Sequence, residues 1–479
     1  MSDYSVVHLC CGVGGGGLGF RRAGFHGLAA IDVDEAACRD YERLVGEPAT
    51  CADLATIRAS ELRELAGPEA PDVLFTSAPC KGFSGCLPEA RAVTPRYLAL
   101  NDLAFRSVWL AMEAWPERPP PLVLFENVPR IQSRGRVFLD RIVAMLRGYG
   151  YAVAETVHDC GELGGLAQRR KRFLLVARHQ PQVSAFLRVP SRQRVRGVGE
   201  VLGLLPVPVP GSAEGGPMHR LPRLAAINWV RLALIPAGGD WRDIPDAVRL
   251  PARGGRQNGP YGVEDWGTPS HAVLGHAAAR DTWGSVADPR VTCRRNDGGH
   301  GVRPWGQHSH SIIAHPSIDN FSCQVADPRL GCTPQHSGPM GVVGWATPSH
   351  CVRGHHNTNN APAAVADRRV PEIVGPPIDL NDKRPTYLVI RAADGTWHRP
   401  MTTLELAALQ GFPVRDERGE WLVLDGQSHR RWRQAIGNAV PPPTAEAIAK
   451  SCAATLDTAR SGGWTLDGRA IWVREEARA

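Results

Sequence analysis

Three short segments of the sequence place reactive or charged side chains at the ends of predicted strands. Pro79-Cys80 follows an apolar run, and a thiolate at such a strand end, beside the ligand crevice of a sheet, is an effective nucleophile. Glu126 ends a second apolar run, where shielding from water would raise the pKa of its carboxyl group and let it donate a proton. Arg170 and Arg172 enter a third run as alternate residues, so their side chains point the same way. These residue types together indicate nucleophilic chemistry assisted by an acid.

A glycine-rich turn follows the first predicted strand. Residues 11–17 are Cys-Gly-Val-Gly-Gly-Gly-Gly, and glycines there let the backbone turn sharply and come close to a bound ligand. Asp32, twenty residues after Gly12, ends the next strand and is placed to accept hydrogen bonds from ribose hydroxyls. Taken alone, the turn would equally suit a nicotinamide or flavin enzyme, or a tight turn that binds nothing.

Short β-branched runs alternate with helical stretches over residues 1–178. We expect buried strands at residues 4–9, 27–31, 72–76, 122–126, 151–156 and 172–177, and helices near 35–44, 98–114 and 137–148. This alternation predicts an α/β fold with a parallel sheet covered on both faces. The sheet would bring Cys80 and Glu126 to the same edge.

The character of the sequence changes after residue 180, where Pro and Gly interrupt the chain and indicate a domain boundary near 180–200. Three copies of one unit of about 40 residues follow, at about 263–372. Trp266, Trp305 and Trp345 are 39 and 40 residues apart, and each is followed at matching offsets by Ser-His, a second His, Asp and Arg. We expect each copy to be a module of short strands and turns. Helical periodicity returns near residue 399.

The composition is that of a globular protein of two or three domains, with 479 residues, 43% of them hydrophobic, and a net charge of +7. Because the sequence shows neither a long apolar stretch nor a basic leader, we expect a cytoplasmic protein that does not enter a membrane. The twelve cysteines contain no CxxC pair, which indicates reduced thiols, and no His or Cys spacing predicts a metal site. Nearly all the positive charge is arginine, which suits forked contacts to phosphate and guanine or else reflects the codon usage of a GC-rich genome.

Several short motifs occur in a fixed order along the chain. They are the turn at 11–17, Asp32, Asp53 in Ala-Asp-Leu, Pro79-Cys80, Glu126-Asn127-Val128, residues 168–172, residues 399–402 through 409–413, and Gly437-Asn438-Ala439-Val440-Pro441. In this order the chain resembles the cytosine-C5 DNA methyltransferases, which use S-adenosyl-L-methionine. Each motif is weak alone, but the ordered set is highly specific, and the family's variable target-recognition region falls on the repeats.

The resemblance implies a Rossmann-like class I methyltransferase domain at residues 1–180. A smaller, irregular β-rich target-recognition domain would occupy 181–398, and a segment at 399–479 would return to the catalytic domain. The activity implied is that of a site-specific DNA (cytosine-5-)-methyltransferase, of restriction-modification or solitary or phage type, acting on a flipped-out cytosine in double-stranded DNA. Cys80 would add to C6 of the base and Glu126 would donate toward N3, while Arg170 and Arg172 would contact the base and keep the surroundings of the thiol positive.

The resemblance also assigns binding residues. Those expected to bind the cofactor are Cys10, Gly12, Gly14, Gly15, Asp32, Val33, Asp53, Leu54, Pro79, Asn438 and Val440. We expect DNA contacts from Lys81, Ser84, Arg294, Arg295 and Arg353. A monomer suffices to flip one base, duplex DNA is the expected partner, and a cognate restriction endonuclease is a further one.

Two departures from the family pattern leave alternatives open. His8-Leu9-Cys10 stands where the family has Asp-Leu-Phe, which would suit a catalytically altered DNA-binding relative, and Lys81 stands where Gln is common. A tRNA cytosine-C5 methyltransferase is the other alternative. The repeat-bearing region of roughly 200 residues favours DNA, because sequence readout needs extra surface. The target sequence and the biological role are not determined by these motifs.

Overall fold

A computed structural model describes residues 4–79, 94–184, 187–188, 190–237 and 386–461, with short pieces at 263–265, 285–287, 302–304, 324–326, 342–343, 345–349, 351, 364–367, 369, 384 and 472–473. The chain divides into two compact units. The first comprises residues 1–244 and 338–479, and the second comprises residues 245–337. The sequence-based domain limits of 180 and 398 stay a prediction.

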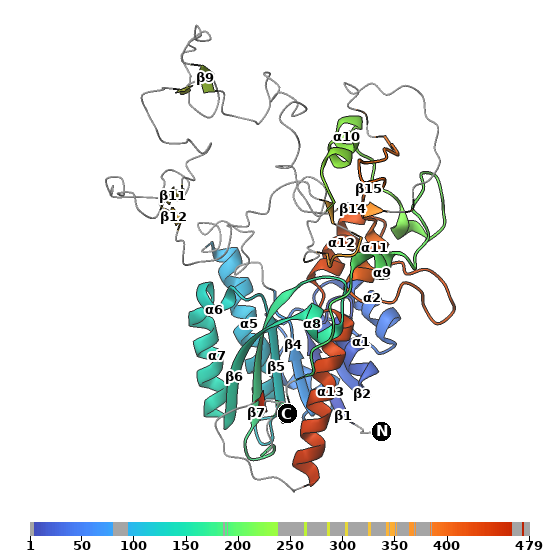
Figure 1. The fold of residues 1–479 in the computed structure, drawn as a ribbon. Coiled ribbons are helices and arrows are strands. Elements are labelled where there is room, and N and C mark those ends of the chain that lie inside the picture. Colours follow the sequence, from blue (N-terminus) through green and yellow to red (C-terminus); the bar gives the residue numbers. More distant parts are fainter. Residues whose placement is uncertain are drawn as a thin grey trace, which may run out of the picture. The chain divides into compact units, whose positions relative to one another are not determined.

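The first unit is built on a mixed seven-stranded sheet in the order β3-β2-β1-β4-β5-β7-β6 (Figure 1). Its strands are β1 (Tyr4–Leu9), β2 (Phe25–Asp32), β3 (Thr50–Cys51), β4 (Val73–Thr76), β5 (Leu122–Asn127), β6 (Tyr151–Asp159) and β7 (Lys171–His179). Six of these strands had been expected from the apolar runs, with ends that differ by no more than three residues. The two-residue strand β3 is too short to give a periodic signal.

One strand departs from the expected parallel arrangement, because β7 runs antiparallel to both of its neighbours, β5 and β6. The eleven residues between β6 and β7 hold only the short helix α8 (Cys160–Gly164). A parallel connection needs a crossover of a dozen or more residues, usually through a full helix, whereas antiparallel strands can be joined by a short loop. The start of β7 therefore lies at the sheet edge where β5 ends.

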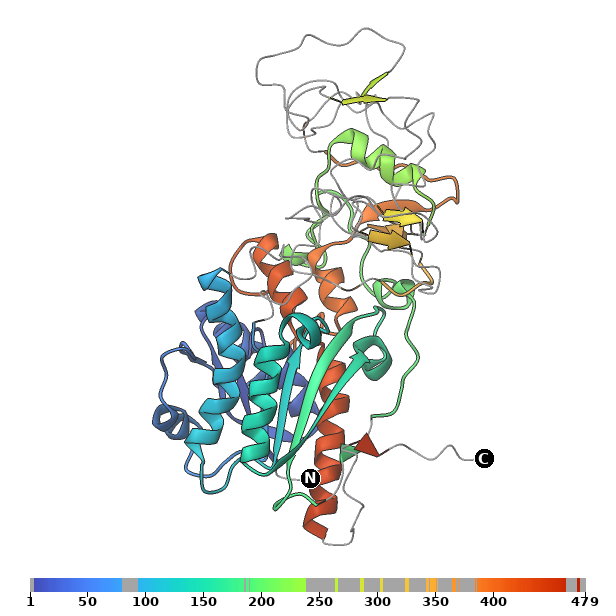
Figure 2. The ribbon, with the colours of Figure 1, turned by 90° about the vertical axis from the view of Figure 1, so that its left-hand side faces the viewer.

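Helices cover both faces of the sheet (Figure 2). On one face, alternate strand residues such as Val7 and Leu9 pack with α3 (Ala59–Ala66), α5 (Pro95–Ala114) and α7 (Arg136–Gly148). On the other face, Tyr4 and Val6 pack with α1 (Gly15–Arg22) and α13 (Pro442–Ser461). Helices α2 (Glu35–Val45) and α6 (Ile131–Arg134) complete this part. Successive residues of β1 thus pack into two separate cores, one on each face of the sheet, as a doubly covered sheet requires.

The C-terminal helix α13 is an integral part of the sheet domain, although about 260 residues separate it from β7. It packs closely along α1. A Cβ atom on Gly19 of α1 would lie 2.5 Å from the Cβ of Ala445 and 2.6 Å from the carbonyl oxygen of Pro442, so only glycine allows this approach. This close packing holds α13 against the sheet domain, and the expected return of the whole segment 399–479 stays a prediction.

The first unit has further elements outside the seven-stranded sheet. They are β8 (Leu187–Arg188), α9 (Val198–Leu202), the 3₁₀ helix η1 (Pro217–His219), α10 (Ala226–Leu234), β13 (Val342–Val343), β14 (Ala364–Asp367), β15 (Trp397–Pro400), α11 (Thr403–Leu409), α12 (His429–Asn438) and β16 (Trp472–Val473). Helices α9, α11 and α12 contribute apolar side chains to one shared cluster. Arg399 of β15 is fully buried between the carboxylates of Asp367 and Glu405.

Each of the three sequence copies contains one pair of short parallel strands. The pairs are β9 (Val263–Asp265) with β10 (Ser285–Ala287), β11 (Val302–Pro304) with β12 (Gln324–Ala326), and β13 with β14. In every pair the partner residues are 22 positions apart, as in Val263 with Ser285 and Val302 with Gln324. The first two pairs belong to the second unit and the third pair to the first unit.

In the described part of the chain, no helix is both long enough and apolar enough to cross a membrane.

Candidate active site

The edge of the sheet at which β4 and β5 end brings three predicted segments together. The two strands are parallel neighbours, so Thr76 and Phe125 lie side by side. Because β7 is antiparallel to β5, the beginning of β7 lies at the same edge, and Glu126 is paired with Leu174 in the ladder. The sheet topology therefore brings three groups to one edge. They are the segment that leads to Cys80, the carboxylate of Glu126, and the two arginines, Arg170 before β7 and Arg172 within it.

Glu126 forms the centre of the described site. Its side chain is 11% exposed, and Nε of Arg172 lies 3.2 Å from Oε1 of Glu126. Burial raises the pKa of Glu126, and the nearby charges of Arg172 and Arg170 reduce that rise. A carboxyl group in such surroundings is held closer to neutrality than an exposed one and can act as a proton donor.

The segment that leads to Cys80 is fixed to the end of β5. Nδ2 of Asn127 donates to the carbonyl oxygen of Ala78 at 3.2 Å, and the N–H of Ser77 donates to the carbonyl oxygen of Leu9 at 3.2 Å. Pro79 is the last described residue of this segment and is partly buried. Cys80, the predicted nucleophile, lies outside the described residues, as do the predicted DNA contacts Lys81, Ser84, Arg294, Arg295 and Arg353.

Arg170 is almost fully buried, at 1% exposure, and connects three parts of the chain. Its Nη2 donates to the carbonyl oxygens of Gly437 at 2.9 Å and Ala439 at 3.1 Å, and its Nη1 donates to Sγ of Cys351 at 3.2 Å. Its backbone N–H donates to Oδ1 of Asp159 at 2.9 Å. Arg170 therefore anchors the returning C-terminal segment beside the site. The family motif predicted for Arg170 a contact to the base and a positive charge near the thiol, but not this structural role.

The glycine turn and Asp32 are hydrogen-bonded to each other, and their expected role in binding the cofactor stays a prediction. The N–H of Gly12 donates to Oδ2 of Asp32 at 2.9 Å, and the N–H of Asp34 donates to Oδ1 of the same carboxylate at 3.0 Å. Gly12 has a φ of +52° with nothing within 4 Å of the position its Cβ would take, so the turn faces open space there. Cys10, at the start of the turn, has a φ of 56°, which is left-handed and unusual for a residue with a side chain.

The remaining turn glycines are required by packing. Gly14 has a φ of +89°, and its Cβ would lie 2.7 Å from Cγ2 of Val45. A Cβ on Gly15 would collide with the carbonyl oxygen of Val440, so the turn is in close contact with the C-terminal segment. Val440 is buried and Asn438 is exposed.

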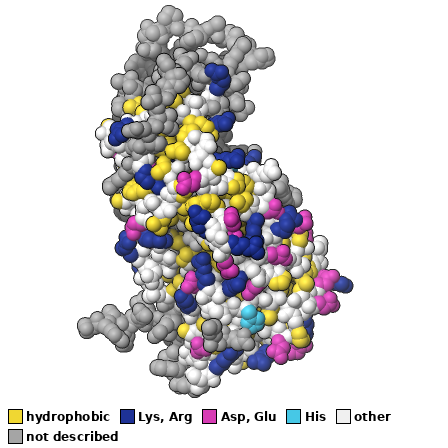
Figure 3. Space-filling view, turned by 90° about the vertical axis from the view of Figure 1, so that its right-hand side faces the viewer, with side chains coloured by type: hydrophobic (Ala, Val, Ile, Leu, Met, Phe, Trp, Pro, Cys, Tyr) yellow, Lys and Arg dark blue, Asp and Glu magenta, His cyan; other side chains and the backbone are white. Residues whose placement is uncertain are grey.

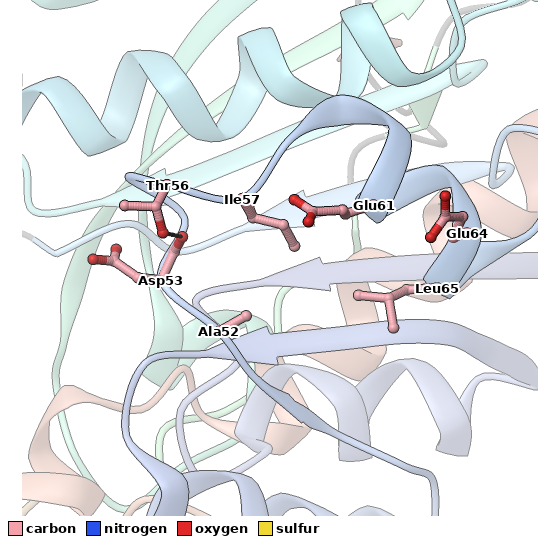
Figure 4. Close-up of a pocket in the computed structure, with 7 residues that line it drawn as sticks. All are labelled: Ala52, Asp53, Thr56, Ile57, Glu61, Glu64 and Leu65. Carbon is pink, nitrogen blue, oxygen red and sulfur yellow. Dashed lines mark hydrogen bonds between the residues drawn. The ribbon is translucent and has the colours of Figure 1, made fainter.

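Asp53 lines a hollow of about 510 Å³ in front of α3 (Figure 4). Thr56, Ile57, Glu61, Glu64 and Leu65 line the rest of it with Ala52. Asp53 itself is exposed and Leu54 is buried, while Val33 is 67% exposed at the end of β2. Of the eleven predicted cofactor residues, only Asp53 lines this hollow, so the hollow covers at most one margin of a cofactor site.

His8 and His158 are two histidines whose imidazole pKa is lowered by burial. His8 is 1% exposed and packs against the rings of Phe20 and Phe75, and burial lowers its pKa to about 3. His8 is therefore a neutral core residue beneath α1 and not part of the glycine turn. His158 is paired with Arg172 across β6 and β7, and burial lowers its pKa to about 4. Sequence reasoning singled out neither His158 nor Cys351, because their proximity to the arginines arises from strand pairing and from long-range packing.

Figure 3 shows one face of the molecule, on which Lys and Arg side chains are interspersed with Asp and Glu. Ion pairs of this kind link α2 to the C-terminal segment, with Nε of Arg39 lying 2.6 Å from Asp425 and Nη1 of Arg431 lying 3.0 Å from Asp34. The described residues of that face therefore form no extended field of positive charge. Among the described residues, no group of three or more His, Cys, Asp or Glu side chains could hold a metal ion.

Residues 4–196 and 350–454 match the sequence model of the family described as C-5 cytosine-specific DNA methylase. The chain belongs to this family. The two matched segments cover more than half of the chain and contain every described site residue discussed above. The methylases of this family depend on S-adenosylmethionine and act on cytosine in DNA.

Individual relatives support this assignment. The methylase is 29% identical over 247 residues to the type II methylase M.HgiDII of Herpetosiphon aurantiacus, covering 51% of this chain and 67% of the relative. It is 30% identical over 231 residues to the type II methyltransferase M.XorII of Xanthomonas oryzae pv. oryzae, covering 47% of this chain and 49% of the relative. The matched stretches thus span about half to two thirds of these relatives' lengths. The methyltransferase EhMeth of Entamoeba histolytica superposes with a TM-score of 0.52 at 12% identity, over 94% of this chain and 98% of that one, which shows the shared fold.

Proposed function

We propose that this methylase transfers a methyl group to C5 of a flipped-out cytosine in double-stranded DNA, with Cys80 as the covalent nucleophile. The observation that carries the proposal is the buried Glu126 beside Arg172, 3.2 Å away, at the sheet edge to which the Pro79-Cys80 segment leads. An acid with a raised pKa next to a nucleophile is what addition to an aromatic base requires.

In the proposed reaction the thiolate of Cys80 forms a bond to C6 of cytosine, and Glu126 gives its proton to N3. Protonation at N3 prevents negative charge from building up on the ring, and Arg172 stabilises the carboxylate that remains. C5 then has the electron density to form a bond to a methyl carbon. Loss of the C5 proton to a base and departure of the thiolate restore the C5–C6 double bond, and return of the N3 proton to Glu126 restores the free enzyme. S-adenosylmethionine, when bound, supplies the electrophilic methyl group, and the bond from that methyl carbon to sulfur breaks to leave the neutral thioether.

The residues at the glycine turn fit this cofactor. The open space at Gly12 lets a ligand approach the backbone, and the Asp32 carboxylate is held in place by two N–H groups while keeping lone pairs for ribose hydroxyls. Asp53 would bind the adenine amino group beside the exposed Val33. Val440 already touches Gly15, so the C-terminal segment would close the pocket. His8, which hinted at an altered relative, lies in the core and does not alter this set.

The target base has to leave the duplex, because C6 is not accessible to a thiol inside the base stack, and flipping costs a few kcal/mol that protein contacts offset. The similarity to type II methyltransferases supports a defined target site and a restriction endonuclease as the partner activity.

The test is transfer of labelled methyl from S-adenosylmethionine to unmodified duplex DNA, with tRNA in parallel and bisulfite sequencing of the DNA product. We expect label in DNA at bisulfite-resistant cytosines within one sequence context. Label confined to tRNA would replace the proposed substrate, and label in neither would refute the activity.

The nucleophile is tested by Cys80→Ser, with Cys86→Ser in the same segment as the matched control. Cys80→Ser should abolish transfer and keep duplex binding, whereas Cys86→Ser should retain transfer. A Cys80→Ser variant that still methylates would show that another group attacks C6.

A further inference from the structure

The third sequence copy, residues 342–369, belongs to the unit that holds the sheet, whereas the first two copies belong to residues 245–337. In this copy the repeated Trp, Asp and Arg contact one another. Arg369 lies over the ring of Trp345 at 5.1 Å and donates to the carboxylate of Asp367 from Nε at 3.0 Å and from Nη2 at 3.1 Å. Asp367 is fully buried and also accepts from Arg399. The repeated side chains of this copy are therefore used to attach it to the body of the unit.

Segment 345–349 lies between residues 167–169 and residues 197–198 and is hydrogen-bonded to both. The N–H of Ser349 donates to the carbonyl oxygen of Ala167, and the N–H of Arg169 donates to that of Ser349, at 2.8 and 2.9 Å. On its other side, the N–H of Val198 donates to the carbonyl oxygen of Thr347 at 2.8 Å. A Cβ on Gly197 would lie 2.5 Å from the carbonyl oxygen of Ala346, so glycine is needed for this approach. The third copy is thus hydrogen-bonded to the backbone that enters β7.

Cys351 follows directly and contacts the site. Its Sγ accepts a hydrogen bond from Nη1 of Arg170 at 3.2 Å, while Nη2 of the same guanidinium holds Gly437 and Ala439. At the corresponding positions the first and second copies have Ala272 and Ser311. A sulfur acceptor at this position is therefore particular to the copy that meets Arg170.

We propose that the third copy positions Arg170 for catalysis through Cys351. The proposal rests on the proposed function, since Arg170 acts on Glu126 and on the C-terminal segment within that site. Cys351 is a positioning residue, because it acts through the guanidinium that lowers the pKa of the buried carboxyl. Loss of a single fixed contact beside the reacting groups lowers the rate of chemistry more than it changes binding of a remote part of the substrate.

The experiment compares Cys351→Val, Cys351→Ala and Cys351→Ser in the full chain by steady-state methyl transfer. Val fills the space of Cys without an acceptor, and Ser supplies an oxygen acceptor. We expect Val and Ala to lower kcat about tenfold, with KM for duplex DNA changed less than about twofold, and Ser to recover most of kcat. Cys452→Ala in α13, which removes a buried cysteine outside the site, is the matched control, with kcat unchanged. A wild-type kcat in Cys351→Val, or a rise in KM alone, would overturn the positioning role.

If the wild-type protein methylates no DNA, the proposed function fails; an active wild type with a fully active Cys351→Val refutes this inference alone.

Discussion

Replacing Arg399 with Met should cost about 3–5 kcal/mol of unfolding free energy at neutral pH. The guanidinium of Arg399 donates to Asp367 from Nε at 3.0 Å and from Nη2 at 2.7 Å, and to Glu405 from Nη1 at 2.9 Å and from Nη2 at 2.6 Å. All three side chains are fully buried. Met keeps the length of the side chain and removes the charge, which leaves two buried carboxylates with less compensation.

The magnitude follows from the partners that remain. Removing one member of a buried ion pair costs about 3–5 kcal/mol, because the other charge stays buried. Asp367 would keep Arg369, and Glu405 would keep the N–H of Thr402 at 2.7 Å, so the loss should not exceed that range.

The loss should also depend on pH in a definite direction. Burial acts to raise the pKa of both carboxyl groups, but it is outweighed by the charge of Arg399, by its hydrogen bonds to Glu405 and by those of Arg369 to Asp367, so each pKa lies below its usual value. This stabilisation is present above the unfolded pKa of about 4 and is lost as pH falls through the folded pKa values. In the variant both pKa values should be higher than in wild type, because the charge of Arg399 is gone, so the groups take up protons more readily and the difference from wild type shrinks toward pH 4.5.

Urea unfolding at pH 8.0, 6.0 and 4.5, followed by tryptophan fluorescence, measures this difference. Arg391→Ala is the control, because Arg391 is exposed and should change stability by less than about 0.5 kcal/mol. A loss below about 1 kcal/mol at pH 8.0, or a loss that stays constant across the three pH values, would refute the reasoning.

Three further outcomes follow from the packing. Gly19→Ala should destabilise the protein by about 1–3 kcal/mol in urea unfolding through its clash with Ala445, whereas Gly148→Ala, with nothing within 4 Å, should be neutral or stabilising; equal effects would refute the packing argument. The φ of Cys10 is 56°, a conformation that glycine adopts more readily than alanine. Cys10→Gly should therefore have a melting temperature at least as high as that of Cys10→Ala, although glycine usually costs about 1 kcal/mol relative to alanine. A lower melting temperature for the glycine variant would contradict this. Glu126→Gln should slow methyl transfer at least a hundredfold, and an active variant would exclude Glu126 as the acid. The same variant should be more stable than wild type above pH 7, because the raised pKa of Glu126 gives wild type stability at low pH that is lost as pH rises.

The local elements of the sheet domain were readable from the amino-acid sequence. The run 4–9 coincides with β1, and the expected helix at 35–44 differs from α2 by one residue. These elements bury continuous or periodic apolar residues, and that signal is contained within a short window of sequence. The motif order likewise identified the family, because motifs depend on residue types and spacing and not on contacts.

The remaining features of the fold and the site depend on long-range contacts, which no local sequence pattern specifies. The reversed direction of β7 places Arg172 beside Glu126, and it depends on how the chain after β6 returns across the sheet. Arg170 was predicted from its motif, but its contacts to Gly437, Ala439 and Cys351 join residues up to 269 positions apart. Three copies that look equivalent in sequence belong to two different units for the same reason: the environment of a residue is set by the surfaces that pack against it, and those come from distant parts of the chain.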